Sequence, residues 1–543
     1  MAILILVQTW GVPLASAQIT TVGGDNSFQF KDGYTIVTHA VPANDSGPWS
    51  ITADGAGHIW FVEENSNQLG SFNPNTGVFT QYPIPTPYST PVAVTADAKG
   101  NVWFTELSTN KLGELPQGES QIMERPIPGA EIPLGNTTET LGCGPGAILA
   151  DPTGSIWVAC LFSNQIDEYF PTNKTFASFD LTVFPSGPAG MLLDGKGDLW
   201  FTAADANMLG KATISQLRNG TSDGIDEFAP LNATYLYRFT LETSFLGGST
   251  TAESSLPTPS GIALDSSGRL WVTEHVDSSF DSYDPATGSL DRYWTSQTGG
   301  AYGFGVTFPN GIAINQNGTV WIAEHYGNRV AEFNPVSGQL IEYPVSNSTY
   351  DGVYQLTLDR NGNPWFVEIQ GNSIGELLPS SDQSPLTMTL PTTATEPGTG
   401  GMISVPIGIS EPKTSTRTTE LKFNVSGITT TGILENMTWH FAPDAVSIAP
   451  GASGETNLTL ATRDLSPGTY YLTLTAGAEP QGVLYSVILK LTVTEGGSPW
   501  TLPAILVGGT GVVVISLLLL WRRRLNAPYV PHTEAHGLIL QRF

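Results

Sequence analysis

The stretch "PNGIAINQNGTVWIAEH" (309–325) closely repeats the stretch "PSGIALDSSGRLWVTEH" (259–275). Each contains an apolar segment, a polar turn with a glycine, and a second apolar segment around a tryptophan. Apolar runs of this length, rich in β-branched and aromatic residues and separated by such a turn, are typical of β-hairpins. Both stretches also end in Glu-His, so the two repeats place an acid and an imidazole at the same point of the hairpin.

The same hairpin recurs along the chain. Its tryptophan appears in seven units, as Trp60, Trp103, Trp157, Trp200, Trp271, Trp321 and Trp365. A third short strand follows each hairpin, such as "NRVAEFNP" (328–335), and a fourth usually follows, such as "QLIEYPV" (339–345). Four short strands in a unit of about 43 residues are the pattern of propeller blades.

The seventh unit lacks its fourth strand, because the sequence becomes polar and rich in proline after residue 379. A candidate for the missing strand precedes the first unit: "YTIVTHAVP" (34–42), which is similar to "FTQYPIP" (79–85). Pairing of the first strand with the last blade removes the open sheet edge. We therefore predict an all-β fold in which residues 34–380 form a seven-bladed β-propeller closed by an N-terminal strand.

Both ends of the chain carry targeting patterns. Residues 1–17 are apolar and end in a small-x-small motif, which predicts a signal peptide. The run "LPAILVGGTGVVVISLLLLW" (502–521) contains no charge and is long enough to cross a bilayer, with three arginines directly after it. By the positive-inside rule, this transmembrane helix places the tail (522–543) in the cytoplasm and the preceding chain outside a cell membrane. A buried core helix is the alternative interpretation.

Residues 391–496 differ in composition and resemble the Ig-like β-sandwiches that are appended to many exported microbial proteins. The alternation in "YYLTLTA" (470–476) fits a strand with one buried face. A spacer above the membrane and a module that binds carbohydrate or a protein partner both remain open.

The charge balance restricts the partners. Lys and Arg total 22 against 49 Asp and Glu, a net charge of −27, which disfavours nucleic acid. Ten Asn-x-Ser/Thr sequons suit a glycosylated, exported protein. They begin at Asn44, Asn136, Asn173, Asn219, Asn232, Asn317, Asn347, Asn424, Asn436 and Asn457.

Cys143 and Cys160 are the only cysteines of the chain. Cys143 precedes the inner strand of the third unit and Cys160 ends its second strand, so the hairpin brings them near each other. Export favours oxidation, so we predict one disulfide; two free thiols are the alternative.

The repeated phrases resemble those of streptogramin lyases, the virginiamycin B lyase group of seven-bladed propellers. The best matches are "GHIWFVEENSNQLGSF" (57–72) and "GNVWFTELSTNKLGEL" (100–115). The resemblance implies a metal-dependent elimination that opens streptogramin B antibiotics, with catalytic histidines directly after the proline that opens the inner strands of the last blades. That position holds Trp49, Val92, Gly146, Ala189, Ser260, Asn310 and Tyr354, so antibiotic lyase activity is not expected.

A second phrase, "FPNGIAINQNG" (308–318), is similar to one in gluconolactonase-like propellers. In those propellers the asparagine is a metal ligand, so the resemblance implies this role for Asn310.

Glutamate ends the second strand in most units, and histidine follows it in only two. The glutamates are Glu63, Glu106, Glu274, Glu324 and Glu368, and the histidines are His275 and His325. Either the glutamates hold a neighbouring blade, or they join the histidines as ligands of a divalent cation such as Mg²⁺ or Ca²⁺. Long insertions at 129–143, 246–259 and 296–308 fall on the same face, around the channel mouth.

Two function classes follow. The first is a surface-anchored module that binds or senses an extracellular small molecule, glycan or protein at the channel mouth. The second is a metal-dependent lyase or lactonase that acts on an extracellular small molecule. Whether the chain is an enzyme stays open at this point.

Overall fold

The computed structural model describes residues 19–22, 25–29, 34–134, 137–219, 224–228, 237–243, 248–254, 258–276, 278–296, 306–346, 350–379, 386–390, 402–413, 418–429, 432–433, 438–461, 468–477, 483–495 and 513–519. The predicted signal peptide and cytoplasmic tail lie outside these residues. Within them the fold is all-β apart from the short helix α1 (Ile214–Arg218).

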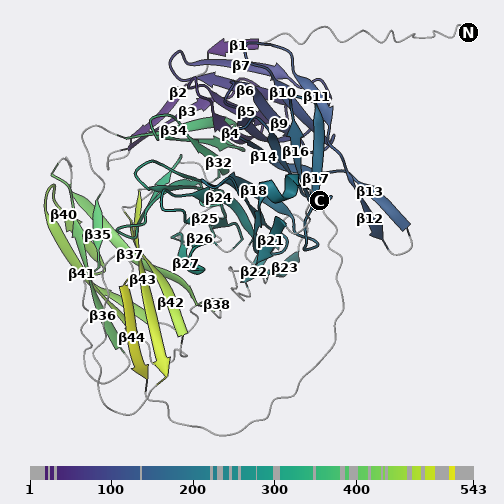
Figure 1. Ribbon diagram of the computed structural model, residues 1–543. Helices are drawn as coiled ribbons and strands as arrows, with labels where there is room; N and C mark the ends of the chain where they lie inside the picture. Colours follow the sequence, from purple (N-terminus) through teal and green to yellow (C-terminus); the bar gives the residue numbers. More distant parts are fainter. Residues whose placement is uncertain are drawn as a thin grey trace, which may run out of the picture.

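Each sequence unit forms one antiparallel sheet that begins with the predicted hairpin (Figure 1). The inner strands are β4 (Pro48–Ala53), β8 (Pro91–Ala96), β14 (Pro145–Ala150), β18 (Pro188–Leu193), β24 (Pro259–Leu264), β28 (Pro309–Ile314) and β32 (Val353–Leu358). The second strands are β5 (Ile59–Glu63), β9 (Val102–Glu106), β15 (Ile156–Cys160), β19 (Leu199–Ala203), β25 (Leu270–Glu274), β29 (Val320–Glu324) and β33 (Pro364–Glu368).

Two further strands complete each sheet. The third strands are β6 (Gln68–Asn73), β10 (Lys111–Leu115), β16 (Gln165–Phe170), β20 (Met208–Ala212), β26 (Ser279–Asp284), β30 (Arg329–Asn334) and β34 (Ser373–Pro379). The fourth strands are β7 (Val78–Pro83), β11 (Met123–Pro126), β17 (Thr175–Asp180), β21 (Ile225–Phe228), β27 (Ser289–Trp294), β31 (Gln339–Pro344) and β3 (Tyr34–Ala40).

The last of these, β3, comes from the N-terminal end of the chain and completes the sheet of the seventh unit. It pairs antiparallel with β34, from Tyr34 opposite Pro379 to Ala40 opposite Ser373. The inner strands contact one another in the cyclic order β4, β8, β14, β18, β24, β28, β32 and back to β4. The sheets are therefore arranged like the blades of a propeller around a central channel.

The hairpin turn recurs because an aspartate organises it. In the first unit, Asp54 Oδ1 accepts the backbone N–H groups of Ala56 and His58, and its Oδ2 accepts the indole N–H of Trp60 at 2.8 Å. The turn glycine, Gly57, has φ +91°, a conformation that costs little without a Cβ. The Asp-x-x-Gly motif thus fixes both the turn and the orientation of the tryptophan.

Asparagines at the start of the third strands link neighbouring sheets. Asn67 has φ +57°, and its side-chain oxygen accepts the backbone N–H of Ser89 at 2.7 Å. Asn372 does the same for Ser46 at 2.7 Å, across the junction of the last and first units. Asn tolerates this left-handed backbone, which explains its recurrence.

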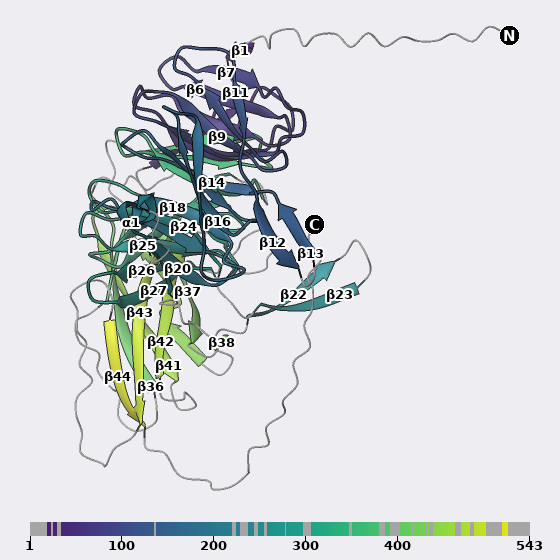
Figure 2. The same cartoon turned by 45° about the vertical axis from the view of Figure 1, so that its right-hand side comes forward.

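Two of the predicted long loops contain β-hairpins. In the first, β12 (Ala130–Leu134) pairs with β13 (Thr137–Leu141). The second contains β23 (Gly248–Ser254), which pairs with β22 (Tyr237–Thr243). Figure 2 shows both hairpins projecting from the ring of sheets. Two N-terminal strands, β1 (Ile19–Val22) and β2 (Asp25–Gln29), add to the outer edges of the sheets that hold β7 and β3.

The C-terminal strands pack beside the ring of sheets. They are β35 (Thr387–Thr389), β36 (Met402–Ser410), β37 (Thr419–Thr429), β38 (Gly432–Ile433), β39 (Thr438–Ala442), β40 (Ala445–Ile448), β41 (Ser453–Ala461), β42 (Gly468–Gly477) and β43 (Leu484–Glu495). β43 pairs antiparallel with β31, so one sheet continues from the sixth unit into these strands. Thr473 also donates to the backbone oxygen of Trp294 at 3.2 Å.

The predicted helix over 502–521 differs from the structure. Its described part forms β44 (Val513–Leu519), which pairs parallel with β43. The segment begins with Val-Val-Ile, whose branching at Cβ favours extended backbone. Among the described residues, no helix has the length and apolar character required to cross a membrane.

Candidate functional site

The central channel contains a cavity of about 370 Å³ where the inner strands meet. The second residue of each inner strand faces it: Trp49, Val92, Gly146, Ala189, Ser260, Asn310 and Tyr354. Leu107 and Leu161, from the ends of second strands, line the apolar side formed by the second to fourth units. The polar and aromatic side is formed by Trp49, Asn310, Tyr354 and Gln355. The channel therefore offers one apolar wall and one hydrogen-bonding wall.

The structure brings His275 and His325 together beside the second wall. Their ring centroids lie 5.8 Å apart, and the planes are inclined by 21°, close to stacked. His275 Nδ1 lies 3.3 Å from the backbone oxygen of Pro309, the first residue of the next inner strand. His325 Nε2 lies 2.6 Å from Tyr350 Oη, within hydrogen-bond distance. The ring of Tyr354 is edge-on to His325, with centroids 5.0 Å apart.

Burial keeps both imidazoles neutral. Burial lowers the pKa of His275 to about 4, although the hydrogen bond with Pro309 acts in the opposite direction and raises it. Burial and the neighbouring His275 lower the pKa of His325 to about 3. Burial also raises the pKa of Tyr354, although its hydrogen bond with Asn310 lowers it. At neutral pH this wall therefore consists of uncharged hydrogen-bonding groups.

The recurring glutamates do not join the histidines. All five are buried, with exposed fractions between 0% and 3%. Glu63 accepts hydrogen bonds from Ser66 and from Gln81 of β7, and Glu106 accepts one from Thr109. Glu368 accepts one from Ser373 of β34. These contacts lie within each glutamate's own sheet, so the glutamates support the sheets instead of the channel mouth.

Glu274 and Glu324 follow the same pattern with different partners. Glu274 lies 3.8 Å from Arg292 of β27, which forms a shorter ion pair with Asp281 at 2.5 Å. Burial and the neighbouring Glu342 raise the pKa of Glu324 well above its usual value. Arg292 and Glu342, the neighbours of the two glutamates, lie on the fourth strands of the same sheets, away from the groups that contact the histidines.

Among the described residues, the channel mouth contains no group of three His, Cys, Asp or Glu side chains close enough together to bind one metal ion. Across the described residues, the one group of three side chains that could hold a metal contains Cys143, Cys160 and Asp167. Its two sulfurs are bonded to each other, with a Cα–Cα separation of 4.5 Å, so they are not free to act as ligands. The predicted pair of cysteines is thus joined as a disulfide.

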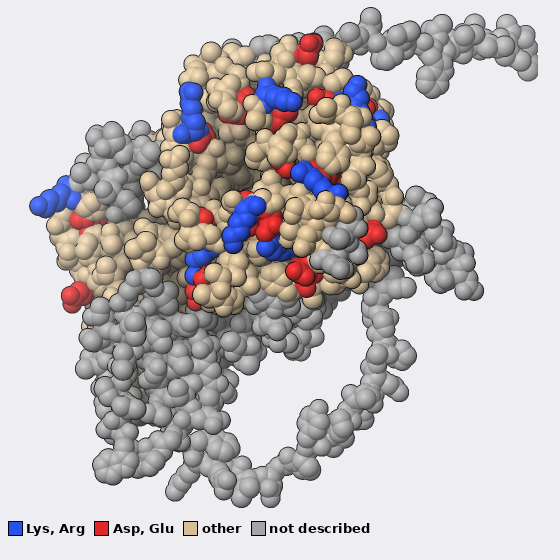
Figure 3. Space-filling view, viewed as in Figure 1, with Lys and Arg blue, Asp and Glu red and all other residues tan. Residues whose placement is uncertain are grey.

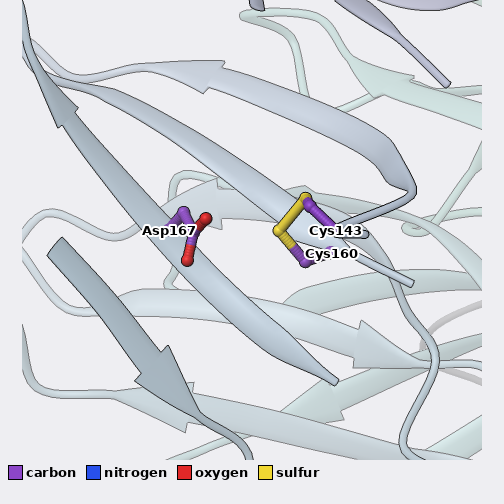
Figure 4. Close-up of side chains that lie close together, drawn as sticks. All are labelled: Cys143, Cys160 and Asp167. Atoms are coloured by element: carbon purple, nitrogen blue, oxygen red, sulfur yellow. A yellow bond between two sulfur atoms is a disulfide. The ribbon is translucent and has the colours of Figure 1, made fainter. Parts of the chain in front are cut away.

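Asp167 lies beside this disulfide, on the third strand of the same sheet (Figure 4). Its side chain is fully buried, and its hydrogen-bonding neighbour is Ser178, the residue opposite it on β17. Burial raises the pKa of Asp167 to about 7. The carboxyl group is therefore a proton-binding site within the core.

Asn310 is 4% exposed and reaches Tyr354, so the structure places it in the hydrogen-bonding wall. Tyr350 was not predictable from the repeat, because it precedes the inner strand of the seventh unit in a loop with no counterpart in the other units. Its one signal is its place in "NSTYDGVY" (347–354), four residues before Tyr354.

The sequon asparagines within the described residues are all exposed: Asn44, Asn173, Asn219, Asn317, Asn424 and Asn457. Asn136, Asn232, Asn347 and Asn436 lie outside the described residues. The face in Figure 3 carries basic and acidic side chains in mixed positions, without an extended patch of one sign.

Comparison with known proteins identifies the kind of propeller. The sequence profile of the Virginiamycin B lyase family matches residues 29–138, which span the first two units. The search of curated proteins gave no match. Selenomethionine-substituted virginiamycin B lyase from Staphylococcus aureus is 22% identical, with a TM-score of 0.50, over 63% of this chain and 99% of that one. A streptogramin B lyase structure is 22% identical, with a TM-score of 0.50, over 64% of this chain and 98% of that one.

A third structure, a catalytically inactive variant of the Staphylococcus aureus lyase with Quinupristin, is 21% identical. Its TM-score is 0.50, over 63% of this chain and 99% of that one. The fold is therefore that of a β-propeller. More particularly, the chain contains a streptogramin lyase-like β-propeller, followed by C-terminal strands that extend one of its sheets.

Proposed function

We propose that this protein is a seven-bladed, cell-surface propeller that binds or senses an uncharged, partly apolar extracellular molecule at its channel mouth. The observation that carries the proposal is the pairing of two walls around one cavity. The apolar wall with Leu107 and Leu161 faces a wall with Asn310, Tyr354 and Gln355. Ligand sites combine a largely apolar lining with a few placed polar groups in this way.

The charge state of the mouth supports an uncharged ligand. His275 and His325 have pKa values of about 4 and about 3, so neither offers a positive charge to an anion at neutral pH. Glu64, at the matching place in the first unit, is half-buried, and burial raises its pKa. An anionic ligand therefore finds no positive charge at the two imidazoles, and burial disfavours the charged form of Glu64.

Binding is testable without knowledge of the natural ligand. A set of uncharged, partly apolar small molecules is added to the full chain, and a bound compound is expected to raise Tm by mass action. Tyr354→Ala and Asn310→Ala are expected to abolish the rise, because both side chains belong to the hydrogen-bonding wall. Lys196→Ala, in an exposed turn of the fourth unit, should leave it unchanged. A rise that survives both wall substitutions would show that the ligand binds elsewhere.

A lyase or lactonase is the second candidate, favoured by two imidazoles at the mouth of a lyase-like propeller. Their low pKa values argue against it, since a general base works best with a pKa near the working pH. We expect quinupristin, incubated with the full chain and Mg²⁺, to keep its cyclic form, because Ser260, Asn310 and Tyr354 occupy the positions where histidine is implied. Chromatographic retention and fragmentation by mass spectrometry are the measurements, since elimination opens the ring without a change of total mass. Ring-opened product would establish the enzyme and refute a purely binding role.

Membrane anchorage is part of this proposal. It is supported by the uncharged run over 502–521 and the three arginines that follow, and it requires residues 513–519 to leave β43 and form a helix in the bilayer. We further propose that residues 391–496 form an Ig-like sandwich and that the exposed sequons carry glycans. Protease added to intact cells should release the propeller into the medium and leave the tail with the cells. Loss of the tail alone would show the opposite orientation.

A further inference from the structure

A second hollow lies between the first and second units, at the end of the sheets opposite the channel mouth. Its volume is about 870 Å³, within the range of about 300–1,000 Å³ that ligand clefts occupy. The hairpin turns after β4 and β8 and the loop after β10 form its walls. We call this hollow the Trp60 groove, after the side chain at its base.

Trp60 differs from its six counterparts in the repeat. Those tryptophans are between 0% and 5% exposed, whereas Trp60 is only partly buried and lines the groove. Tyr82 lies beside it, with ring centroids 5.8 Å apart and planes inclined by 30°. The hydrogen bond to Asp54 at 2.8 Å fixes the indole in place. The groove thus presents a prepared aromatic surface.

Cationic side chains cover the tryptophans of two other units. In the second unit, Arg125 lies over Trp103, 5.5 Å from the ring centroid. Glu114 forms an ion pair with the Arg125 guanidinium at 2.5 Å and so keeps it there. In the fourth unit, Lys211 lies 5.5 Å from the centroid of Trp200. The residue opposite Trp60 on β6 is instead Ser71, which in turn pairs with Thr80. Among the described residues, no cationic side chain lies over Trp60.

Polar side chains surround the two rings. Lys99, Gln117 and Glu119 are exposed on the walls, and Asp97 lies in the turn between them. The wall that carries Gln117 is fixed, because its backbone N–H donates to Asn101 Oδ1 at 3.0 Å. Asp54 is already ionised for its structural role: burial opposes ionisation, but hydrogen bonds from Trp60 and His58 lower its pKa.

We propose that the Trp60 groove is a binding site for an uncharged oligosaccharide. The C–H face of a sugar ring is slightly positive and packs against the negative face of an indole or phenol ring. Its hydroxyl groups donate to the carboxylates at the rim, accept from the ammonium group and do either with the amide. The carboxylates of Asp54, Asp97 and Glu119 outnumber the ammonium group of Lys99, so an acidic glycan is disfavoured.

A proline-rich peptide is the other ligand that aromatic grooves commonly accept. Such grooves are lined mainly by aromatic rings, whereas this groove has only Trp60 and Tyr82 as large rings, beside the charged and amide side chains of Asp54, Asp97, Lys99, Gln117 and Glu119. The number of hydrogen-bonding groups around only two rings therefore favours the sugar.

The test uses the full chain and defined probes. Cellohexaose, maltohexaose, mannohexaose and xylohexaose are titrated by calorimetry, with decaproline as the peptide probe. At least one hexasaccharide is expected to bind, and Trp60→Ala is expected to weaken it at least tenfold. Lys99→Ala and Gln117→Ala, both at exposed positions that leave the core intact, should each weaken it severalfold. They keep the test valid if Trp60→Ala fails to fold.

Lys196→Ala is the matched control, because Lys196 precedes the turn glycine of the fourth unit as Lys99 precedes that of the second. It should bind the sugar as the natural protein does, and so should His325→Ala at the channel mouth. Binding of decaproline in place of the sugars, affinity unchanged by all three groove substitutions, or no binding of any hexasaccharide would overturn the proposal. None of these results bears on the ligand of the channel mouth.

Discussion

Replacement of Ile36 by aspartate is expected to unfold the propeller. Ile36 lies on β3, is fully buried and pairs with Leu377 of β34, which is also fully buried. A carboxylate at this place has no partner, and an uncompensated buried charge costs on the order of 4 kcal/mol or more. Because β3 completes the last sheet, its loss also exposes the edge of β34. Thermal unfolding followed by circular dichroism measures the change.

Thr35→Asp is the control for this substitution. Thr35 is the preceding residue of β3, lies on the other face of the strand and is partly exposed. Its replacement is expected to cost less than about 1 kcal/mol, as for most surface positions. An Ile36→Asp protein with unchanged Tm would mean that the ring of sheets does not depend on its N-terminal strand.

The free energy of unfolding is expected to fall as the pH rises from 6.5 to 8. Burial raises the pKa of Glu368 to about 8 and those of Asp167, Glu106 and Glu376 to about 7. In this interval the unfolded chain has released these protons, whereas the folded chain still holds part of them. The folded state binds more protons, so stability decreases with pH. For Glu368 alone the loss is about 2 kcal/mol, at about 1.4 kcal/mol for each unit of pKa.

The two imidazoles act in the opposite direction at lower pH. His275 and His325 stay neutral in the folded state down to about pH 4 and about pH 3, whereas the unfolded chain protonates them below about pH 6.5. Their contribution to stability is therefore present above pH 6.5 and is lost as the pH falls. Between pH 6.5 and 8 the unfolded chain releases only the last protons of these imidazoles, so the carboxyl groups dominate the pH dependence in this interval.

Glu368→Gln tests the assignment. Glutamine keeps the shape and the hydrogen bond with Ser373 but does not titrate, so the variant should lose about 2 kcal/mol of the pH dependence between 6.5 and 8. Urea denaturation at several pH values measures this slope. Glu455→Gln, an exposed glutamate on β41, serves as the control and should keep the full slope. Equal slopes in all three proteins would contradict a proton on Glu368.

The repeat made the propeller-like sheets predictable, because each unit contains the aspartate and glycine that define its own hairpin turn. Asp54 and Gly57 fix one hairpin, and their counterparts fix the others by the same hydrogen bonds. The place of β3 was also predictable, since an unpaired strand at one end of the chain matched a missing strand at the other. Local chemistry and the need to close the ring predicted the same arrangement.

The candidate site was only partly predictable. His275 and His325 were expected to lie near each other, because they occupy the same position in adjacent units, and their rings do stack. Whether a glutamate would accompany them depended on which face of the strand the side chain uses and on its partners. Gln81, which binds Glu63, is eighteen residues away and gave no signal in the sequence. Tyr350 comes from a loop outside the repeat, so periodicity could not place it.

The pairing of β31 with β43 determines how force passes through the molecule. A pull on the C-terminal strands is carried by the backbone hydrogen bonds of one continuous sheet into the sixth unit, instead of through a linker that swivels. The buried side chain of Gln339 braces the same junction, donating to the backbone oxygen of Leu386 at 2.7 Å. The shared sheet therefore fixes the angle between the channel axis and the C-terminal strands. If the C-terminal strands are attached to a surface, this attachment also determines the direction in which the channel opens.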